Sequence, residues 1–228
     1  MQRIVVLSGA GISAESGIRT FRDSDGLWEN HRIEDVATPA AWVRNPALVL
    51  TFYRQRWEQL AQVAPNAAHK ALVALESQYK VHIVTQNVDD LHERAGSTHV
   101  LHLHGELCFA RSSLGRDKQL YPIRNRYIDL GDMAADGSQL RPHIVWFGEA
   151  VPNLEPAIEL AATADHLLVV GTSLQVYPAA SLVNYVSSGC GITVIDPHLS
   201  PTVLPPSTQL IAASATEGVP AWVEQMLG

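Results

Sequence analysis

The stretch IVVLSGAGISA, residues 4–14, decides the fold of this chain. The apolar run from Ile4 to Leu7 predicts a buried strand, and the Gly9-Ala10-Gly11 that follows predicts a tight turn into a helix. Such a turn can present backbone N–H groups to a phosphate, and its glycines let a diphosphate approach without a Cβ clash. The short pattern is also typical of a strand-to-helix turn that needs glycine for steric reasons alone, so both interpretations stay open.

A dinucleotide-binding fold is expected to place an acidic residue at the end of a second strand, roughly 20 residues after the glycines. Residues 18–34 read instead as a polar loop, with Arg22 and Asp25 among its charged residues. If the turn binds a dinucleotide, this loop makes the site an unusual one.

The chain has 228 residues, of which 46% are hydrophobic, and this suits one domain or one domain with a small insert. Its formal net charge of −7 argues against a nucleic-acid binder, which would carry a basic stripe. No apolar run approaches the roughly 20 residues of a membrane span, and Met1 to Arg3 leads into a core strand rather than a cleavable signal. We therefore expect a cytoplasmic monomer without membrane or nucleic-acid partners.

Short β-branched runs alternate with helical stretches along the chain, which predicts an α/β fold with a parallel sheet. Strands are expected at 3–7, 80–85, 98–103, 143–147, 166–171, 191–196 and 208–212. Helices are expected at 46–63, 66–79, 154–164, 178–188 and 217–227. Residues 106–142 interrupt this alternation of strands and helices and have no periodic apolar face, so we expect a small insert between two core strands.

The polar residues Gln86, Asn87 and Asp89 directly follow the predicted strand at 80–85. Ligands of open α/β sheets lie beyond the carboxyl ends of the strands, and amide side chains placed there can hydrogen-bond a ribose or a carboxamide. The alternative is an ordinary polar loop in which Asp89 or Asp90 caps a short helical turn.

Two further polar groups also stand at predicted strand ends. His102 and His104 share one face of a strand, which makes a metal pair conceivable, although no third ligand has a suitable spacing. His104, next to Gly105, is a candidate general base because histidine can take up a proton near neutral pH, but a structural role is the commoner alternative. Gly171-Thr172-Ser173 suits phosphate or ribose binding, and its alternative is a plain turn with a helix cap.

Five motifs in one order resemble the sirtuin family of NAD-dependent protein deacylases. They are GAGISAESGIRTFRD (9–23), TQNVDDLHERAG (85–96), HLHGEL (102–107), RPHIVWFGE (141–149) and GTSLQVYPAA (171–180). The resemblance implies a single catalytic unit over 1–228, with a Rossmann-type, doubly wound parallel sheet and a small inserted domain. The large domain would comprise 1–30, 65–105 and 143–228, and the small domain 31–64 and 106–142.

The resemblance implies NAD as the cofactor and an acyl-lysine protein or peptide as the partner, both bound in the cleft between the domains. The catalytic residues that it implies are His104, as general base, and Asn87. Residues implied to bind the cofactor are Gly9, Ala10, Gly11, Ser13, Ala14, Phe21, Arg22, Trp28, Gln86, Asn87, Val88, Asp89, Gly171, Thr172, Ser173, Asp196 and Ala215. Residues implied to bind the substrate are Tyr53, Arg56, Val145, Phe147, Gly148 and Glu149.

The resemblance also implies the reaction. The acyl oxygen attacks C1′ of the nicotinamide ribose and expels nicotinamide, after which His104 activates the 2′-hydroxyl that takes the acyl group. The products are free lysine and 2′-O-acyl-ADP-ribose. Three other activities stay open: ADP-ribosyl transfer to another acceptor, NAD sensing without catalysis, and a dehydrogenase reaction, to which the polar amides at 86–89 are poorly suited.

Tyr53 and Arg56 share one face of a predicted helix because they are three residues apart. A phenol and a guanidinium in this arrangement can together bind a carboxylate, and the alternative is a surface arginine beside a half-buried tyrosine. The Y-x-x-R spacing resembles the sirtuin class that removes succinyl, malonyl and glutaryl groups, whose bacterial members can also remove acetyl. We therefore expect a deacylase of broad range, and we place Trp146 in the core because it points away from the acyl channel.

The chain has two cysteines, Cys108 and Cys190, which are too few for a disulfide framework or a four-sulfur zinc site. Most sirtuins carry four zinc cysteines in the insert, whereas residues 106–142 contain Cys108 and no histidine. We therefore predict a small domain without zinc, in which apolar residues such as Leu120 and Ile123 supply the folding energy by packing.

Overall fold

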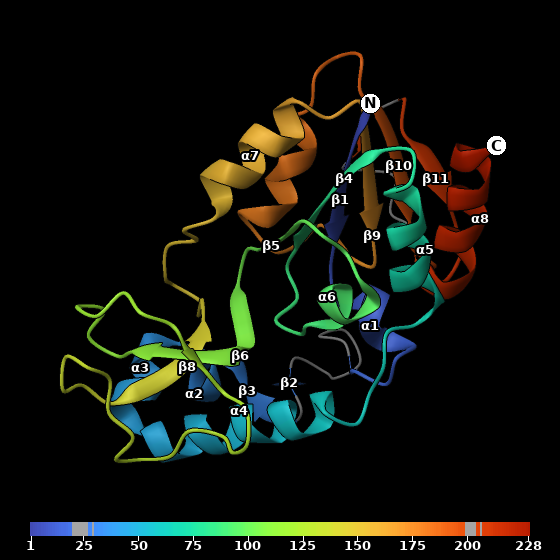
Figure 1. Cartoon of the computed structure of the whole chain (residues 1–228). Helices are drawn as coiled ribbons and strands as arrows, with labels where there is room; N and C mark the ends of the chain where they lie inside the picture. Colours follow the sequence, from blue (N-terminus) through green and yellow to red (C-terminus); the bar gives the residue numbers. More distant parts are fainter. Residues whose placement is uncertain (20–26, 29, 199–203, 206) are drawn as a thin grey trace.

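The computed structural model describes residues 1–19, 27–28, 30–198, 204–205 and 207–228. Its larger part is built on a six-stranded sheet (Figure 1). The strands are β1 (Arg3–Ser8), β4 (Lys80–Thr85), β5 (Val100–His102), β9 (His166–Val170), β10 (Gly191–Ile195) and β11 (Gln209–Ile211). They lie in the order β11-β10-β9-β1-β4-β5, and every neighbouring pair is parallel, which confirms the predicted α/β class with a parallel sheet.

Helices cover both faces of this sheet, α5 and α8 on one face and α7 with η1 on the other (Figure 1). They are α5 (Ala67–Leu75), α7 (Leu154–Ala162), the 3-10 helix η1 (Ala179–Asn184) and α8 (Ala215–Leu227). In β1, Ile4 and Val6 pack in the core under α5 and α8, whereas Val5 and Leu7 pack in the core under α7 and η1. Burial on both faces explains why β1 reads as an unbroken apolar run.

The strand order reverses at β1. After β1 the chain adds β4 and β5 on one side of it, and later β9, β10 and β11 on the other. In such sheets ligands usually lie beyond the carboxyl ends of the strands where the strand order reverses, which is here at β1 and β9. The loop after β1 runs into the short helix α1 (Gly11–Ala14), and the loop after β4 runs into α6 (Leu91–Ala95).

The smaller part combines two separate segments of the chain (Figure 1). The first contains β2 (Leu27–Trp28), β3 (His31–Arg32), α2 (Ile33–Val36), α3 (Pro39–Arg44) and α4 (Pro46–Leu60). The second is an antiparallel sheet in the order β7-β6-β8, with β6 (Gly105–Ser112), β7 (Tyr121–Pro122) and β8 (Leu140–Ile144). One core joins them, in which Phe52 and Tyr53 of α4 pack with Leu107 of β6 and with Trp146.

The strand that we expected at 143–147 in the parallel sheet is wrong in position and in partner. Its place is taken by β8, which pairs antiparallel with β6 so that Gly105 lies opposite Ile144. Gly105 has a φ of 82°, and a Cβ at this position would lie 2.0 Å from the carbonyl oxygen of His143. The chain therefore leaves the large sheet at Gly105, directly after His104.

The other predicted elements are present with shifted ends. The helix expected at 66–79 ends at Leu75, because the next residues form turns rather than a continued helix. The helix expected at 178–188 is the shorter 3-10 helix η1. Such shifts are common, since hydrophobic periodicity marks the middle of a helix better than its ends.

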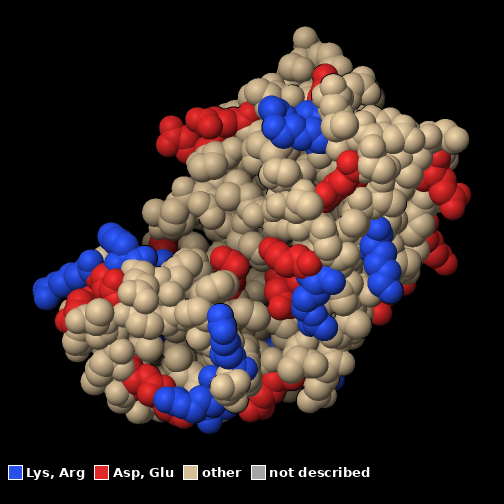
Figure 2. Space-filling view, in the orientation of Figure 1, with Lys and Arg blue, Asp and Glu red and all other residues tan. Residues whose placement is uncertain are grey.

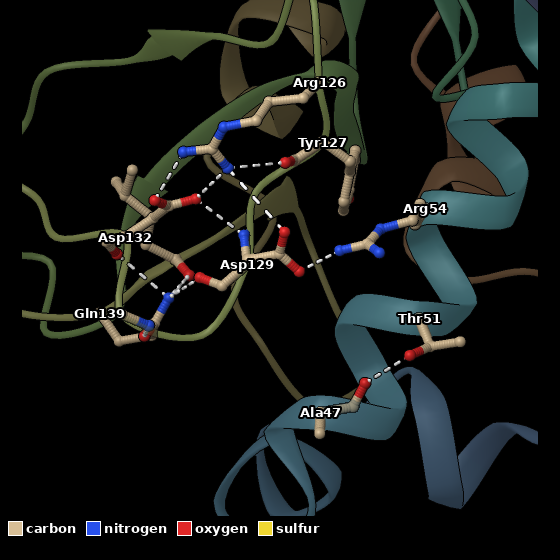
Figure 3. A network of polar contacts seen from close by, with 10 residues as sticks. Ala47, Thr51, Arg54, Arg126, Tyr127, Asp129, Asp132 and Gln139 are labelled. Atoms are coloured by element: carbon tan, nitrogen blue, oxygen red, sulfur yellow. Dashed lines mark hydrogen bonds and ion pairs between the residues drawn. The ribbon is translucent and has the colours of Figure 1, made fainter.

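A network of polar contacts holds the loop between β7 and β8 (Figure 3). Arg126 donates two hydrogen bonds to Asp132, with Nη1–Oδ2 at 2.7 Å and Nη2–Oδ1 at 2.8 Å. Gln139 donates to the carbonyl oxygens of Asp129 and Asp132, at 2.8 and 3.1 Å. Asp129 also pairs with Arg54 of α4, so this loop is fastened to the other segment of the smaller part.

Among the described residues, no group of three or more His, Cys, Asp or Glu side chains is arranged to hold a metal ion, and the zinc-free small domain stays a prediction. None of the helices in this described part is long and apolar enough to cross a membrane. On the face drawn in Figure 2, basic and acidic residues are interspersed rather than gathered in a stripe of one sign.

Candidate active site

A cavity of about 910 Å³ lies where the two parts meet, and its size is typical of ligand pockets. Loops after β1, β4, β5 and β9 line one side, and α4 with the segment after β8 lines the other. The predicted cofactor and catalytic residues that line it are Gly9, Ala10, Gly11, Ala14, Gln86, Asn87, Val88, Asp89, His104, Gly171, Thr172, Ser173, Asp196 and Ala215. The predicted substrate residues that line it are Tyr53, Arg56, Val145, Phe147, Gly148 and Glu149.

The glycines after β1 pack against the loop after β9. Gly9 N–H donates to the carbonyl of Val170 at 3.0 Å, and Gly11 N–H donates to the carbonyl of Gly171 at 2.8 Å. A Cβ on Gly9 would lie 2.7 Å from Cβ of Thr172, and a Cβ on Gly11 would lie 2.7 Å from Cα of Gly171. These two N–H groups are therefore used inside the protein, and the glycines allow the close packing that the steric interpretation of the turn requires.

Ser13 lies behind the cavity wall rather than on it. It is fully buried, and its hydroxyl donates to Oδ2 of Asp89 at 3.1 Å while accepting from Nδ2 of Asn87 at 3.2 Å. The other oxygen of Asp89 accepts from the N–H of Leu91, and burial raises the pKa of this carboxyl. Ser13 thus fixes the side chains of Asn87 and Asp89, and its binding of the cofactor stays a prediction.

Gln86 connects the loop after β4 to the loops on either side. Its side-chain amide donates to Oγ1 of Thr172 at 3.0 Å, and the same hydroxyl oxygen accepts from the N–H of Leu174 at 3.2 Å. Its carbonyl oxygen lies 2.9 Å from Nδ1 of His104. The cavity wall is therefore continuous from β9 through β4 to His104.

His104 has the geometry of a neutral histidine with one nitrogen available to accept a proton. Since the carbonyl of Gln86 can only accept, Nδ1 carries the proton and Nε2 keeps its lone pair. Burial lowers the pKa of His104, which favours the neutral ring. The His104 carbonyl accepts from the N–H of Val145 at 2.8 Å, so the histidine is joined to the substrate side of the cavity.

His102 is arranged differently. Its Nδ1 lies 2.9 Å from the carbonyl of Asn87 and its Nε2 lies 2.8 Å from Oε1 of Glu93, so both nitrogens face acceptors. Burial alone would lower the pKa of His102, but the hydrogen bond to Glu93 and the charge of Glu93 together have the larger effect. The net result is a raised pKa. Because both nitrogens are engaged, the metal pair with His104 is not formed, and His102 supports the backbone of Asn87.

The far end of the cavity is formed by Asp196 and Ala215. Asp196 follows β10 and is buried, with Oδ1 accepting from the N–H of His198 at 2.8 Å. Ala215 is the first residue of α8, and Thr216 beside it bonds Glu15 of the loop after α1 through its N–H and its hydroxyl. Both predicted residues therefore stand at one end of the cavity, beyond the sheet.

Tyr53 and Arg56 both come from α4 and both line the cavity that His104 lines. Tyr53 is fully buried, and its hydroxyl oxygen accepts from Nε1 of Trp146 at 3.1 Å. Arg56 is half-buried, donates to the carbonyl of Phe52, and holds its guanidinium carbon 3.7 Å from the centre of the Phe52 ring. The alternative of a surface arginine beside a half-buried tyrosine therefore does not describe this pair.

The segment after β8 lines the same side of the cavity as α4. Phe147 is 46% exposed at this wall, and Gly148 has a φ of 89°. Glu149 is fixed by Arg141, with Nη1–Oε1 at 2.7 Å, and by Arg111 at 3.3 Å. Trp146 is 2% exposed and belongs to the core, as predicted, but it also lines the cavity, so the expectation that it points away from the acyl channel is wrong.

Comparison with known proteins gives the family. A model of the Sir2 family matches residues 9–178. The chain belongs to the Sir2 family. An NAD-dependent protein deacylase of Helicobacter pylori is 56% identical over 219 residues, covering 96% of this chain and 95% of that protein. A deacylase of the same name from Bacteroides thetaiotaomicron is 50% identical over 224 residues, with 96% and 95% covered.

A solved complex of a Sir2 homologue with NAD has a TM-score of 0.87 and 39% identity to this Sir2-family chain, covering 99% of this chain and 89% of that one. The predicted resemblance to sirtuins is thereby confirmed. Among the cofactor residues that the resemblance implies, Phe21 and Arg22 lie outside the described residues. Trp28 lies in β2, where only the backbone is described.

Sequence reasoning missed one contact of this Sir2-family site. It placed Trp146 in the core but did not connect its indole to Tyr53. The two residues are 93 positions apart and belong to different segments of the smaller part. The charged residues Arg141 and Glu149 on either side of Trp146 indicated that this segment also makes polar contacts. Their spacing in the sequence does not by itself predict the ion pair between them.

Proposed function

We propose that this Sir2-family protein is an NAD-dependent protein-lysine deacylase that removes both acetyl and succinyl groups and releases nicotinamide, 2′-O-acyl-ADP-ribose and free lysine. The observation that carries the proposal is that His104, Tyr53 and Arg56 line one cavity together with the loops after β1, β4 and β9. The names of the relatives support the activity, and the NAD complex of the Sir2 homologue supports the cofactor.

The chemistry of the cavity fits NAD. The glycine turn lets the loops after β1 and β9 approach closely, and the amides of Gln86 and Asn87 provide donors and acceptors for a ribose and a carboxamide. At the other end, the carboxylate of Asp196 suits ribose hydroxyls, and Ala215 leaves room for a flat base. When bound, NAD supplies a ribose carbon that becomes reactive as nicotinamide leaves.

In this proposal His104 is the general base. Its Nδ1 proton is donated to the carbonyl of Gln86, so Nε2 is the atom that takes a proton from a substrate hydroxyl. Asn87, held by Ser13 and by His102, orients the ribose beside it. Both parts of the protein contribute walls to this cavity, and a bound cofactor and peptide would displace water from it, which disfavours simple hydrolysis of the cofactor.

Tyr53 and Arg56 determine the acyl range. Arg56 is a permanent cation on the wall of this cavity, and a carboxylate at the end of a succinyl group is its natural partner. The Phe52 carbonyl and ring hold the guanidinium in place before substrate arrives, which limits the entropy lost on binding. An acetyl group lacks this contact but fits the same channel.

The test is nicotinamide release from NAD with acetyl-lysine and succinyl-lysine peptides of one sequence. We expect His104→Ala to abolish release with both peptides and Arg56→Met to reduce release selectively with the succinyl peptide. His99→Ala, a histidine outside the cavity, and Arg54→Met, two residues away on α4, are the matched controls. Transfer of label from adenine-labelled NAD to protein, with both peptides inert, would overturn the proposal in favour of ADP-ribosyl transfer.

A further inference from the structure

The indole of Trp146 contacts the hydroxyl oxygen of Tyr53, with Nε1 and Oη 3.1 Å apart. An indole N–H can only donate, so the phenol is the acceptor and this bond does not use the phenol's own proton. Both residues line the cavity, on the side that also carries Arg56. The contact therefore fixes the position of Oη at the acyl end of the site.

Trp146 is itself held from two directions. The guanidinium carbon of Arg141 lies 3.2 Å from the centre of the indole ring, in a stacked cation–π arrangement. The backbone N–H of Trp146 donates to Oε2 of Glu149 at 2.8 Å, and Glu149 in turn pairs with Arg141 at 2.7 Å. Arg141 is 6% exposed, and breaking a buried pair of this kind is costly, so the ring is held in one orientation.

We propose that Trp146 is a positioning residue that sets the preference of this deacylase for acyl groups ending in a carboxylate. The inference rests on the proposed function, because it concerns the same acyl subsite. A carboxylate is bound best when phenol and guanidinium are both placed before it arrives, and Phe52 places the guanidinium while Trp146 places the phenol. An acetyl group has no carboxylate and gains nothing from either contact.

The test is Trp146→Phe, which keeps an aromatic ring under Arg141 and removes the indole N–H. We expect the ratio of kcat/KM for a succinyl-lysine peptide to kcat/KM for the matched acetyl-lysine peptide to fall about 3- to 10-fold, the effect of losing one hydrogen bond. The loss should appear mainly in KM for the succinyl peptide. Trp42→Phe is the control. Trp42 belongs to α3, and its ring packs against the ring of Trp146 with the two centroids 5.8 Å apart. This control variant should leave the ratio unchanged.

A double-mutant cycle separates positioning from packing. If Trp146 acts through Tyr53, then Trp146→Phe should lower the ratio no further in a Tyr53→Phe background. An unchanged ratio in Trp146→Phe, whether or not kcat/KM falls equally with both peptides, would overturn the inference. Losses of the ratio that add in the double mutant would also overturn it. A wild-type protein that deacetylates but does not desuccinylate would overturn the proposed acyl range instead, so the two failures are distinguishable.

A second measurement tests the inference on the wild type and on Tyr53→Phe, in case Trp146→Phe does not fold. The chain has five tryptophans, so the indole N–H signals can be followed by NMR with ¹⁵N labelling. The signal that moves in Tyr53→Phe identifies Trp146. We expect the same signal to shift when succinyl-lysine peptide is added to the wild type and to shift less with acetyl-lysine peptide. Equal shifts with the two peptides would overturn the inference.

Discussion

His104 Nδ1 lies 2.9 Å from the carbonyl oxygen of Gln86, and this contact assigns the proton of the ring. The neutral ring with Nε2 unprotonated is the form that can act as a base. Burial lowers the pKa of His104, against the opposing effect of the Gln86 hydrogen bond. The base form is therefore dominant at neutral pH.

The first prediction concerns the pH dependence of deacylation. Because burial lowers the pKa of His104 from its ordinary value, kcat/KM should be constant through neutrality and should fall only in the acid range, as the pH drops through this lowered pKa. Initial rates of nicotinamide release between pH 5 and 8 measure the profile, and His99→Ala should reproduce the wild-type curve. An acid limb centred above pH 7 would contradict the assignment.

The second prediction concerns the contact between the loops after β1 and β9. A Cβ on Gly11 would lie 2.7 Å from Cα and 2.9 Å from the carbonyl oxygen of Gly171, which are backbone atoms that cannot turn aside. Gly11→Ala should lower the free energy of unfolding by about 1–3 kcal/mol. Nicotinamide release should fall as well, because the cavity wall shifts. Gly189→Ala is the control, since a Cβ there meets nothing within 4 Å. Equal urea denaturation midpoints for the two variants would count against the packing role of Gly11.

The third prediction concerns metal in the smaller part. The loop between β7 and β8 is held by hydrogen bonds from Arg126 and Gln139 and by the pair between Arg54 and Asp129 (Figure 3). The pKa of the Cys108 thiol is raised to about 12, by burial and by Asp90, so the thiolate that zinc requires is disfavoured. Incubation with a strong chelator should leave Tm and deacylase activity unchanged. Stoichiometric zinc in the purified protein, measured by mass spectrometry of the metal, would refute the prediction.

Much of the fold could be predicted because it depends on local pattern. The apolar run from Ile4 to Leu7 is buried on both faces, and such burial leaves a clear sequence signal. The placement of β8 could not be predicted, since an apolar run reads alike in a parallel sheet and in an antiparallel one. What decides it is the backbone at Gly105, which turns the chain toward His143.

The predicted site residues gather at one cavity because the carboxyl ends of parallel strands share one edge of the sheet. Their individual contacts were less predictable. The partners of Gly9 and Gly11 are Val170, the last residue of β9, and Gly171, which follows it, more than 150 positions along the chain. Ser13 stands in a glycine-rich motif, yet its hydroxyl serves Asn87 and Asp89. Such contacts depend on how loops that are distant in the sequence pack together, and residue spacing does not predict this packing.

The last prediction concerns stability in acid and rests on His69. This side chain is fully buried, its ring packs edge-on against His92 at 4.9 Å, and burial lowers its pKa to about 4. A histidine whose folded pKa is depressed binds its proton more readily in the unfolded chain. Its contribution to stability is therefore complete above pH 6.5 and is lost as the pH falls from 6.5 toward 4.

At pH 5, the loss attributable to His69 should be about 2 kcal/mol, from a gap of about 1.5 pH units below the unfolded pKa. His69→Gln removes the titrating ring and keeps a side chain that can reach the backbone N–H of Asn66, the helix cap that His69 now serves. Urea unfolding at pH 7.5 and pH 5 should show a smaller acid loss in the variant, by about that 2 kcal/mol. Parallel losses in the two proteins would mean that His69 also takes up its proton in the folded protein or that other buried groups, such as His143, carry the acid sensitivity.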